Sequence, residues 1–234
     1  MELLKVFIYV KSSKVGEAYY ESIEKTSSTN VFYISLSELS LNKELYAGEI
    51  IELEIMLKDN LRDYVSVKLL NDIASSDKIQ FLGTVGEDFE AYLITVYDLF
   101  TRWNNNLTPI WNNLKTVEEK RGWLRACFKW SGLNKVITND KTYLINCNEI
   151  NDELDFYYLL GDAFFGYRGY MGGDGNALLD CLGVINVSNE KHNSKVYFKE
   201  YSKLEKLFKK YSPNYFKSIL CQDFIDNGFE IVLK

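Results

Sequence analysis

The chain has 234 residues, more than the roughly 100–200 residues of a usual domain, so its length predicts two domains. A content of 47% hydrophobic and 26% charged residues excludes a disordered chain, and a formal net charge of −6 argues against a nucleic-acid-binding protein. The first apolar run, residues 1–10, is too short for a signal peptide or a membrane span.

Residues 1–138 are expected to form a β-rich α+β domain. Apolar and polar residues alternate in several short runs, which predicts strands at 3–10, 30–36, 48–57, 64–70 and 79–85. The last three runs follow one another closely and favour an antiparallel meander with one solvated face. We expect a helix near 14–25, whereas residues 91–97 fit either a strand or a helix.

Two helix starts are predicted in the last part of this domain. Thr108 followed by Pro109 is typical of a capped first turn, and Thr116 with Glu119 forms the pattern of a capping box. Gly132 is expected to end the second helix. The four tryptophans of this region are interpreted as core residues, with an aromatic binding surface as the alternative: Trp103, Trp111, Trp123 and Trp130.

Residues 139–234 are expected to form an α/β domain. Its predicted strands are 143–147, 196–201 and 229–233, and its predicted helices are one opened by Asp152, one carrying Asp180, and two near 204–211 and 215–224. Asn227 and Gly228 are expected to cap the last helix. Parallel strands require helical crossovers, and this order of elements provides them, so we expect a three-stranded parallel sheet with helices.

Residues 164–182 read FFGYRGYMGGDGNALLDCL, an apolar run, a glycine-rich loop and a short helix with one acid. This layout resembles the core motif of the barstar family of intracellular ribonuclease inhibitors, and the resemblance covers residues 142–234. It implies a barstar-like fold and an immunity protein that blocks the basic active site of a nuclease toxin.

The resemblance also implies the residues that bind the toxin. Tyr170 matches the loop aromatic of the family, Asp180 the acid that enters the phosphate site of the target, and Asp223 a flanking acid on the last helix. Asn176 stands where the family has a second acid and Met171 where it has a tyrosine, which argues for a target other than barnase. The implied surface is Tyr170, Met171, Gly172, Gly173, Asp174, Asn176, Leu179, Asp180 and Asp223.

The distribution of charge favours the same segment. Residues 149–180 contain seven acidic residues and a single basic residue, Arg168. A ribonuclease site is lined with cations that hold phosphate, and carboxylates on a rigid backbone can occupy it. A solvated acidic face with no partner is the alternative interpretation, and Asp174 is a candidate to replace the acid missing at Asn176.

Other functions find less support in the sequence. Gly172 to Gly175 lack the lysine of a phosphate-binding loop, the acids at 174–180 miss the register of a calcium loop, and the single histidine, His192, lies in a polar turn. We therefore expect no catalytic residue, no cofactor and no metal. Scattered cysteines favour free thiols in the cytoplasm, and the expected partner is a cationic nuclease toxin rather than nucleic acid or membrane. A binding module unrelated to toxins is the alternative, with a small enzyme less favoured.

Overall fold

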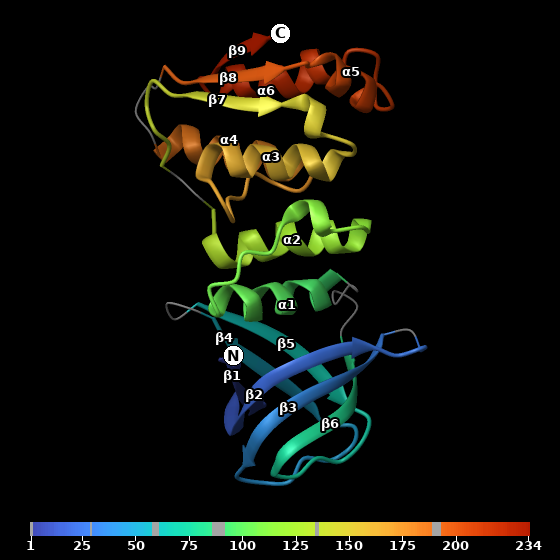
Figure 1. The fold of residues 1–234 in the computed structure, drawn as a ribbon. Helices are drawn as coiled ribbons and strands as arrows, with labels where there is room; N and C mark the ends of the chain where they lie inside the picture. The colour runs from blue at the N-terminus through green and yellow to red at the C-terminus, as the bar shows by residue number, and fades with distance from the viewer. Residues whose placement is uncertain (1, 29, 58–60, 86–91, 134–135, 189–192) are drawn as a thin grey trace. The chain divides into compact units, whose positions relative to one another are not determined.

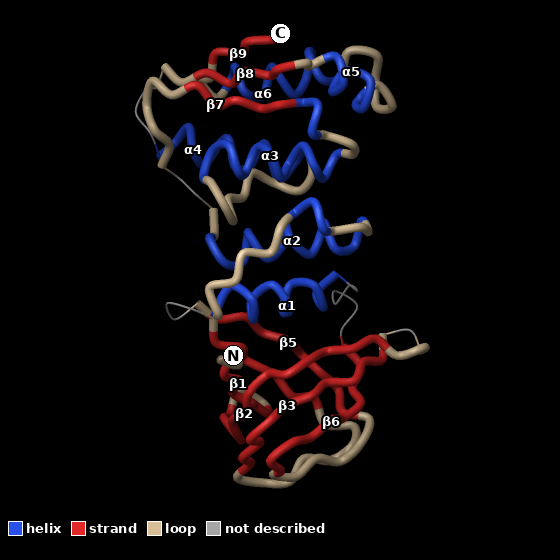
Figure 2. The backbone as a smooth tube through the Cα atoms, viewed as in Figure 1, coloured by secondary structure: helices blue, strands red, loops and turns tan. Residues whose placement is uncertain are grey.

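The computed structural model describes residues 2–28, 30–57, 61–85, 92–133, 136–188 and 193–234. The chain divides into two compact units, residues 1–126 and 127–234. The division falls inside a helix, twelve residues before the boundary at 138 that the sequence suggested. Figure 1 gives the order of the elements, and Figure 2 separates the strand-rich first part of the chain from the mixed second part.

The first unit contains a closed barrel of six antiparallel strands in the order β1-β2-β3-β6-β5-β4. The predicted strands and their antiparallel pairing are confirmed, but the meander closes on itself because β1 also pairs with β4, with Val6 opposite Ile55. The strands are β1 (Leu4–Val10), β2 (Ser13–Lys25), β3 (Val31–Leu41), β4 (Ile50–Met56), β5 (Arg62–Leu69) and β6 (Ser76–Val85).

The helix expected near residues 14–25 is wrong, because this segment is strand β2, paired with both β1 and β3. Its buried residues Val15, Ala18, Tyr20 and Ile23 are spaced by three, two and three positions. Register shifts indicate two β-bulges with the extra residue in β2, one opposite β1 between Lys14 and Gly16 and one opposite β3 between Tyr20 and Ser22. The bulges therefore give a strand a spacing that imitates a helix.

Helices α1 (Tyr92–Asn104) and α2 (Val117–Ser131) follow the barrel, with a 3₁₀ turn, η2 (Trp111–Asn113), between them. The ambiguous segment 91–97 is helical from Tyr92; Ala91 lies outside the described residues. The predicted helix start at Thr108 and Pro109 is wrong, since the short turn begins at Trp111 and has no side-chain cap.

The capping box of α2 is confirmed. The Glu119 amide donates to Thr116 Oγ1 at 3.1 Å, and Glu119 Oε2 accepts from the Thr116 amide at 2.9 Å. Gly132 follows the helix with φ +67°, and its amide donates to the Phe128 carbonyl. Three of the four tryptophans are core residues, as predicted, and Trp130 is half-buried: Trp103 and Trp111 both meet Trp123 edge-on.

The second unit contains a three-stranded sheet in the order β7-β8-β9, and both pairings are parallel. The expected sheet is therefore confirmed at the level of topology. The strands are β7 (Thr142–Asn146), β8 (Lys195–Lys199) and β9 (Glu230–Leu233), and η3 (Cys147–Glu149) is a 3₁₀ turn. The remaining elements are α3 (Glu153–Phe165), α4 (Gly175–Ser188), α5 (Ser202–Phe208), the π-helical η4 (Phe216–Leu220) and α6 (Cys221–Asp226).

Two helix ends in this unit lie where the sequence predicted them. Asp152 caps α3 in a reciprocal capping box with the buried Asp155. After α6, Gly228 adopts φ +91° and donates its amide to the Ile225 carbonyl at 3.0 Å. Both helix ends depend on residues within about one turn of each other, which is why the sequence alone could place them.

Candidate functional site

The segment 164–182 folds as the end of α3, a loop and the first half of α4. Gly166 ends α3 with φ +75°, and its amide donates to the Asp162 carbonyl at 2.8 Å. Asp174 begins α4, where its Oδ1 accepts the Ala177 amide at 2.9 Å. Residues 166–174 thus form one connection with a defined start and a defined end.

The surface of α4 presents a single charge. Leu178, Cys181, Leu182 and Ile185 face the core, whereas the exposed residues are Asn176, Leu179, Asp180, Asn186, Val187 and Ser188. Leu179 is 46% and Val187 88% exposed. A helix face that combines exposed aliphatic residues with one acid and no base differs from an ordinary solvated face, where charges of both signs alternate.

Asp180 is the acid of this face. It is exposed, and within the described ranges it makes no ion pair. The adjacent Cys181 thiol is buried; burial, and in second place the Asp180 charge, raise its pKa to about 12. Cys181 is therefore an inert core residue, and Asp180 presents a carboxylate to solvent.

The other acids of the segment are largely used within the protein. Asp152 and Asp155 cap α3, and Glu153 binds Lys210 Nζ at 2.6 Å and accepts the Tyr211 hydroxyl at 2.9 Å. Asp174 caps α4. The acidic run from residue 149 to residue 180 is thus in part a set of helix caps; Glu149, Asp162 and Asp180 are exposed, and of these Asp180 alone lies on α4.

The loop residues have two different environments. Tyr170 is half-buried, with its ring centroid 5.1 Å from that of Phe128, and Gly173 is also half-buried. Met171 is fully buried, so its side chain packs in the core and does not lie on the predicted surface. Gly172 is also buried and adopts φ +93°; a Cβ there would lie 2.6 Å from the Leu178 amide nitrogen.

Asp223 belongs to another element of the second unit. It lies on α6, which packs on α4, and it is half-buried. Burial, together with the charge of Asp226, raises the pKa of its carboxyl. By exposure and role, the predicted set therefore divides into exposed residues on α4 (Asn176, Leu179, Asp180), half-buried residues (Tyr170, Gly173, Asp223), a capping acid (Asp174) and buried residues of the loop (Met171, Gly172).

A second polar cluster lies on the barrel, and no pattern in the sequence signals it. Glu54 is only 2% exposed, and it stands between the buried residues Leu53 and Ile55 of β4. Its carboxylate accepts the hydroxyls of Tyr9 at 2.7 Å and Tyr64 at 2.8 Å and pairs with Arg62 at 2.7 Å. These donors, the Tyr9 hydroxyl first, hold the pKa of the Glu54 carboxyl below its usual range.

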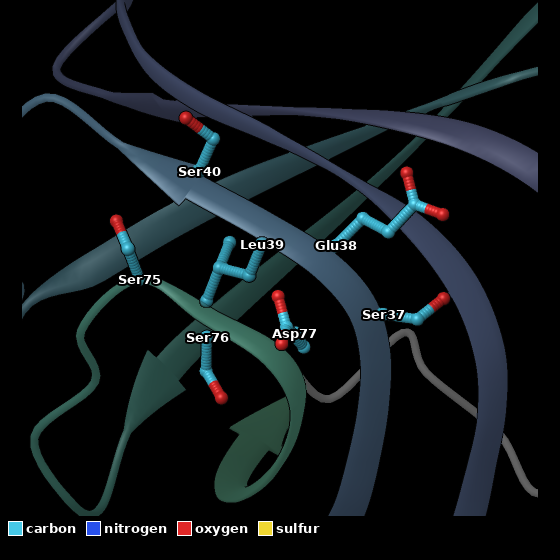
Figure 3. Close-up of a pocket in the computed structure, with 7 residues that line it drawn as sticks. All are labelled: Ser37, Glu38, Leu39, Ser40, Ser75, Ser76 and Asp77. Carbon is cyan, nitrogen blue, oxygen red and sulfur yellow. The ribbon is translucent and has the colours of Figure 1, made fainter.

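An open groove in the first unit is lined by serines and two acids (Figure 3). Ser75 Oγ accepts the Leu41 amide at 2.8 Å, and Ser76 Oγ donates to the Lys78 carbonyl at 2.9 Å. Two hydroxyls of the groove are therefore already hydrogen-bonded to the protein backbone. The carboxylates of Glu38 and Asp77 alone do not indicate which ligand could bind there. The lining residues are Ser37, Glu38, Leu39, Ser40, Ser75, Ser76 and Asp77.

In the described part of the chain no cluster of three or more His, Cys, Asp and Glu residues could hold a metal ion. Among the residues that the structure describes, no helix combines the length and the apolarity needed to cross a bilayer. His192, expected in a surface turn, lies outside the described residues. A scan against protein-family models and a search of curated proteins both find no match to the chain.

Proposed function

We propose that the second unit is a barstar-like inhibitor that binds the basic active site of a nuclease toxin, in the first place a ribonuclease, through α4 and the loop before it. The observation that carries the proposal is the exposed face of α4, where Asp180 shares the helix surface with the exposed side chains of Leu179 and Asn176. Such a face offers one anion to a cationic site and apolar surface around it.

The parallel order β7-β8-β9 with helical connections supports the same proposal, because it agrees with the fold that the resemblance implies. In this proposal the protein works in the cytoplasm and catalyses no reaction of its own. Its four cysteines are free and buried, as suits a reducing compartment. The interaction with the toxin needs no cofactor, nucleic acid or membrane.

The test is a calorimetric titration of the full chain with purified cationic ribonucleases, barnase among them, and with the nuclease of any toxin gene adjacent to this one. The decisive variant is Asp180→Asn, which removes the charge and keeps the shape. It leaves toxin cations buried without a partner, so we expect a loss above about 2 kcal/mol in the free energy of binding. An interfacial aspartate of barstar itself marks the upper extreme of such losses, and for this chain we predict the lower bound alone.

Glu205→Gln is the matched control. Glu205 is on α5, outside the proposed surface, and forms a part-exposed ion pair with Lys217 at 2.7 Å. Loss of such a charge should change the binding free energy by less than about 1 kcal/mol. Equal affinities of Asp180→Asn and wild type for a nuclease that the chain inhibits would refute the proposed site.

The alternative, a protein-binding module unrelated to toxins, uses the same α4 face and predicts no inhibition of any nuclease. Binding to heparin or single-stranded DNA would argue instead for a nucleic-acid-binding role, which the net charge of −6 disfavours. The titration, an assay of nuclease activity in the presence of the chain, and a binding assay with heparin or single-stranded DNA together separate the toxin inhibitor from both alternatives.

A further inference from the structure

The loop before α4 touches α3 through backbone alone at one point. A Cβ at Gly161 would fall against the carbonyl oxygen of Gly169 and 2.9 Å from its carbonyl carbon. A Cβ at Gly169 would fall against the Gly161 carbonyl oxygen and 2.8 Å from its carbon. Neither distance is possible for a real side chain, so the contact exists only because both residues are glycine.

Further contacts fix the loop on both sides of Gly169. The Gly169 amide donates to the Gly166 carbonyl at 2.7 Å, and the Arg168 carbonyl accepts the Ser131 hydroxyl at 3.0 Å. The Arg168 guanidinium carbon lies 5.2 Å from the ring centroids of Trp130 and Tyr167. The turn is therefore held by the backbone and by residues at the end of α2 before the chain reaches Tyr170.

The residues after Gly169 are also held by close packing. Tyr170 packs on Phe128, Met171 is fully buried, and Gly172 contacts the first turn of α4 so closely that no Cβ fits. The position of α4, and with it the position of Asp180, is thus coupled to the place where Gly169 meets α3.

We infer that Gly161 and Gly169 are positioning residues that hold the loop and the start of α4 in the binding conformation before a partner arrives. The inference rests on the proposed function for its meaning in binding, but the rigid loop itself is a property of the free protein. A preformed loop avoids the entropic cost of ordering the interface during association, and this raises affinity without any contact from the glycines to the partner.

The test compares Gly161→Ala with Ala163→Gly, a control two residues away on the same helix. Both exchange glycine and alanine, and the control weakens α3 by propensity without filling the Gly161–Gly169 contact. Amide hydrogen exchange of the free chain is the first measurement. We expect a protected Gly169 amide, which donates to the Gly166 carbonyl, in wild type and in Ala163→Gly, and at least tenfold faster exchange of this amide in Gly161→Ala.

Two results would overturn the inference: an unprotected Gly169 amide in free wild type, or exchange in Gly161→Ala that equals the control. The wild-type measurement stands even if the alanine variant does not fold, and Gly169→Ala provides a second variant on the other side of the contact. Because no toxin enters this experiment, its outcome is independent of whether the proposed function is correct.

The binding arm uses the ribonuclease that wild type binds best in the calorimetric titration. Gly161→Ala should bind it at least tenfold more weakly although Asp180 is intact, whereas Ala163→Gly should bind within twofold of wild type. A Gly161→Ala variant with a displaced loop and unchanged affinity would overturn the role in binding and show that the contact is structural only. If wild type binds no nuclease, the proposed function is wrong, but the inference of a preformed loop is unaffected.

Discussion

The rings of Tyr143 and Phe164 stack with centroids 4.0 Å apart and planes inclined by 6°. Tyr143 belongs to the edge strand β7 and Phe164 to the last turn of α3, so the pair joins the sheet to the helix that precedes the candidate loop. Phe229, directly before β9, meets both rings edge-on. The aromatic core thus fixes the end of α3 from which the loop departs.

Phe164→Ala should destabilise the second unit by about 3–5 kcal/mol, because it removes a buried ring and leaves a cavity between β7 and α3. Phe164 is 6% exposed, so nearly the whole side chain contributes. Chemical denaturation followed by circular dichroism measures the change. The exposed Tyr167→Ala is the control, with an expected loss below about 1 kcal/mol; a loss of that size at Phe164 would contradict the packing described.

The acid stability of the barrel should depend on Glu54. A carboxyl whose pKa is lowered by folding contributes stability that is present above its unfolded pKa of about 4.3 and is lost as the pH falls through its folded pKa. Tyr9→Phe removes the first of the three donors, so the folded pKa rises toward the unfolded value. We expect this variant to be less stable than wild type at pH 7, and to lose less stability as the pH falls from about 5 to the acid transition.

Thermal unfolding at a series of pH values measures this difference. Tyr46→Phe is the control, because Tyr46 donates to the exposed Glu44 at 3.1 Å instead of to a buried acid. Its pH profile should follow that of wild type. If Tyr9→Phe and Tyr46→Phe give parallel profiles, the hydrogen bond from Tyr9 does not set the pKa of Glu54.

The sequence predicted what depends on neighbouring residues and missed what depends on distant ones. The caps at Thr116 and Asp152 were visible because both partners lie within one helical turn. Closure of the barrel was not, since Val6 and Ile55 pair across a long stretch of chain. The environment of Glu54 was likewise not predicted, because Tyr9 comes next to it only through the closing pair β1–β4, and Arg62 and Tyr64 through the register of β4 with β5.

The candidate site shows the same division. The order of strand, helix, loop and helix followed from local patterns, whereas the surface position of Asp180 was implied by the resemblance. Burial of Met171 did not, because it depends on how the loop lies on α3 and α4. The sequence predicted that Asp152 opens a helix and singled out Asp180, but only the structure shows that Asp155 and Asp174 also take part in helix caps.

Gly183→Ala should stabilise α4. A Cβ at this position meets no atom within 4 Å, and Gly183 lies inside the helix with ordinary backbone angles. Alanine removes conformational freedom from the unfolded chain, so we expect a gain of about 0.5–1 kcal/mol in the free energy of unfolding. Denaturant titration measures it. A loss of stability would mean that the face of α4 around Gly183 is covered by part of the protein.

Two variants of Asp174 distinguish a structural role of this residue from a role in binding a partner. Its carboxylate caps α4, and asparagine also accepts the Ala177 amide, whereas alanine cannot. Asp174→Ala should therefore cost about 1 kcal/mol of stability in a denaturant titration, and Asp174→Asn only a few tenths. Because the cap alone accounts for the residue, Asp174→Asn should also bind a nuclease partner within threefold of wild type. Loss of binding in this stable variant, comparable to that in Asp180→Asn, would instead assign Asp174 the place of the acid that Asn176 lacks.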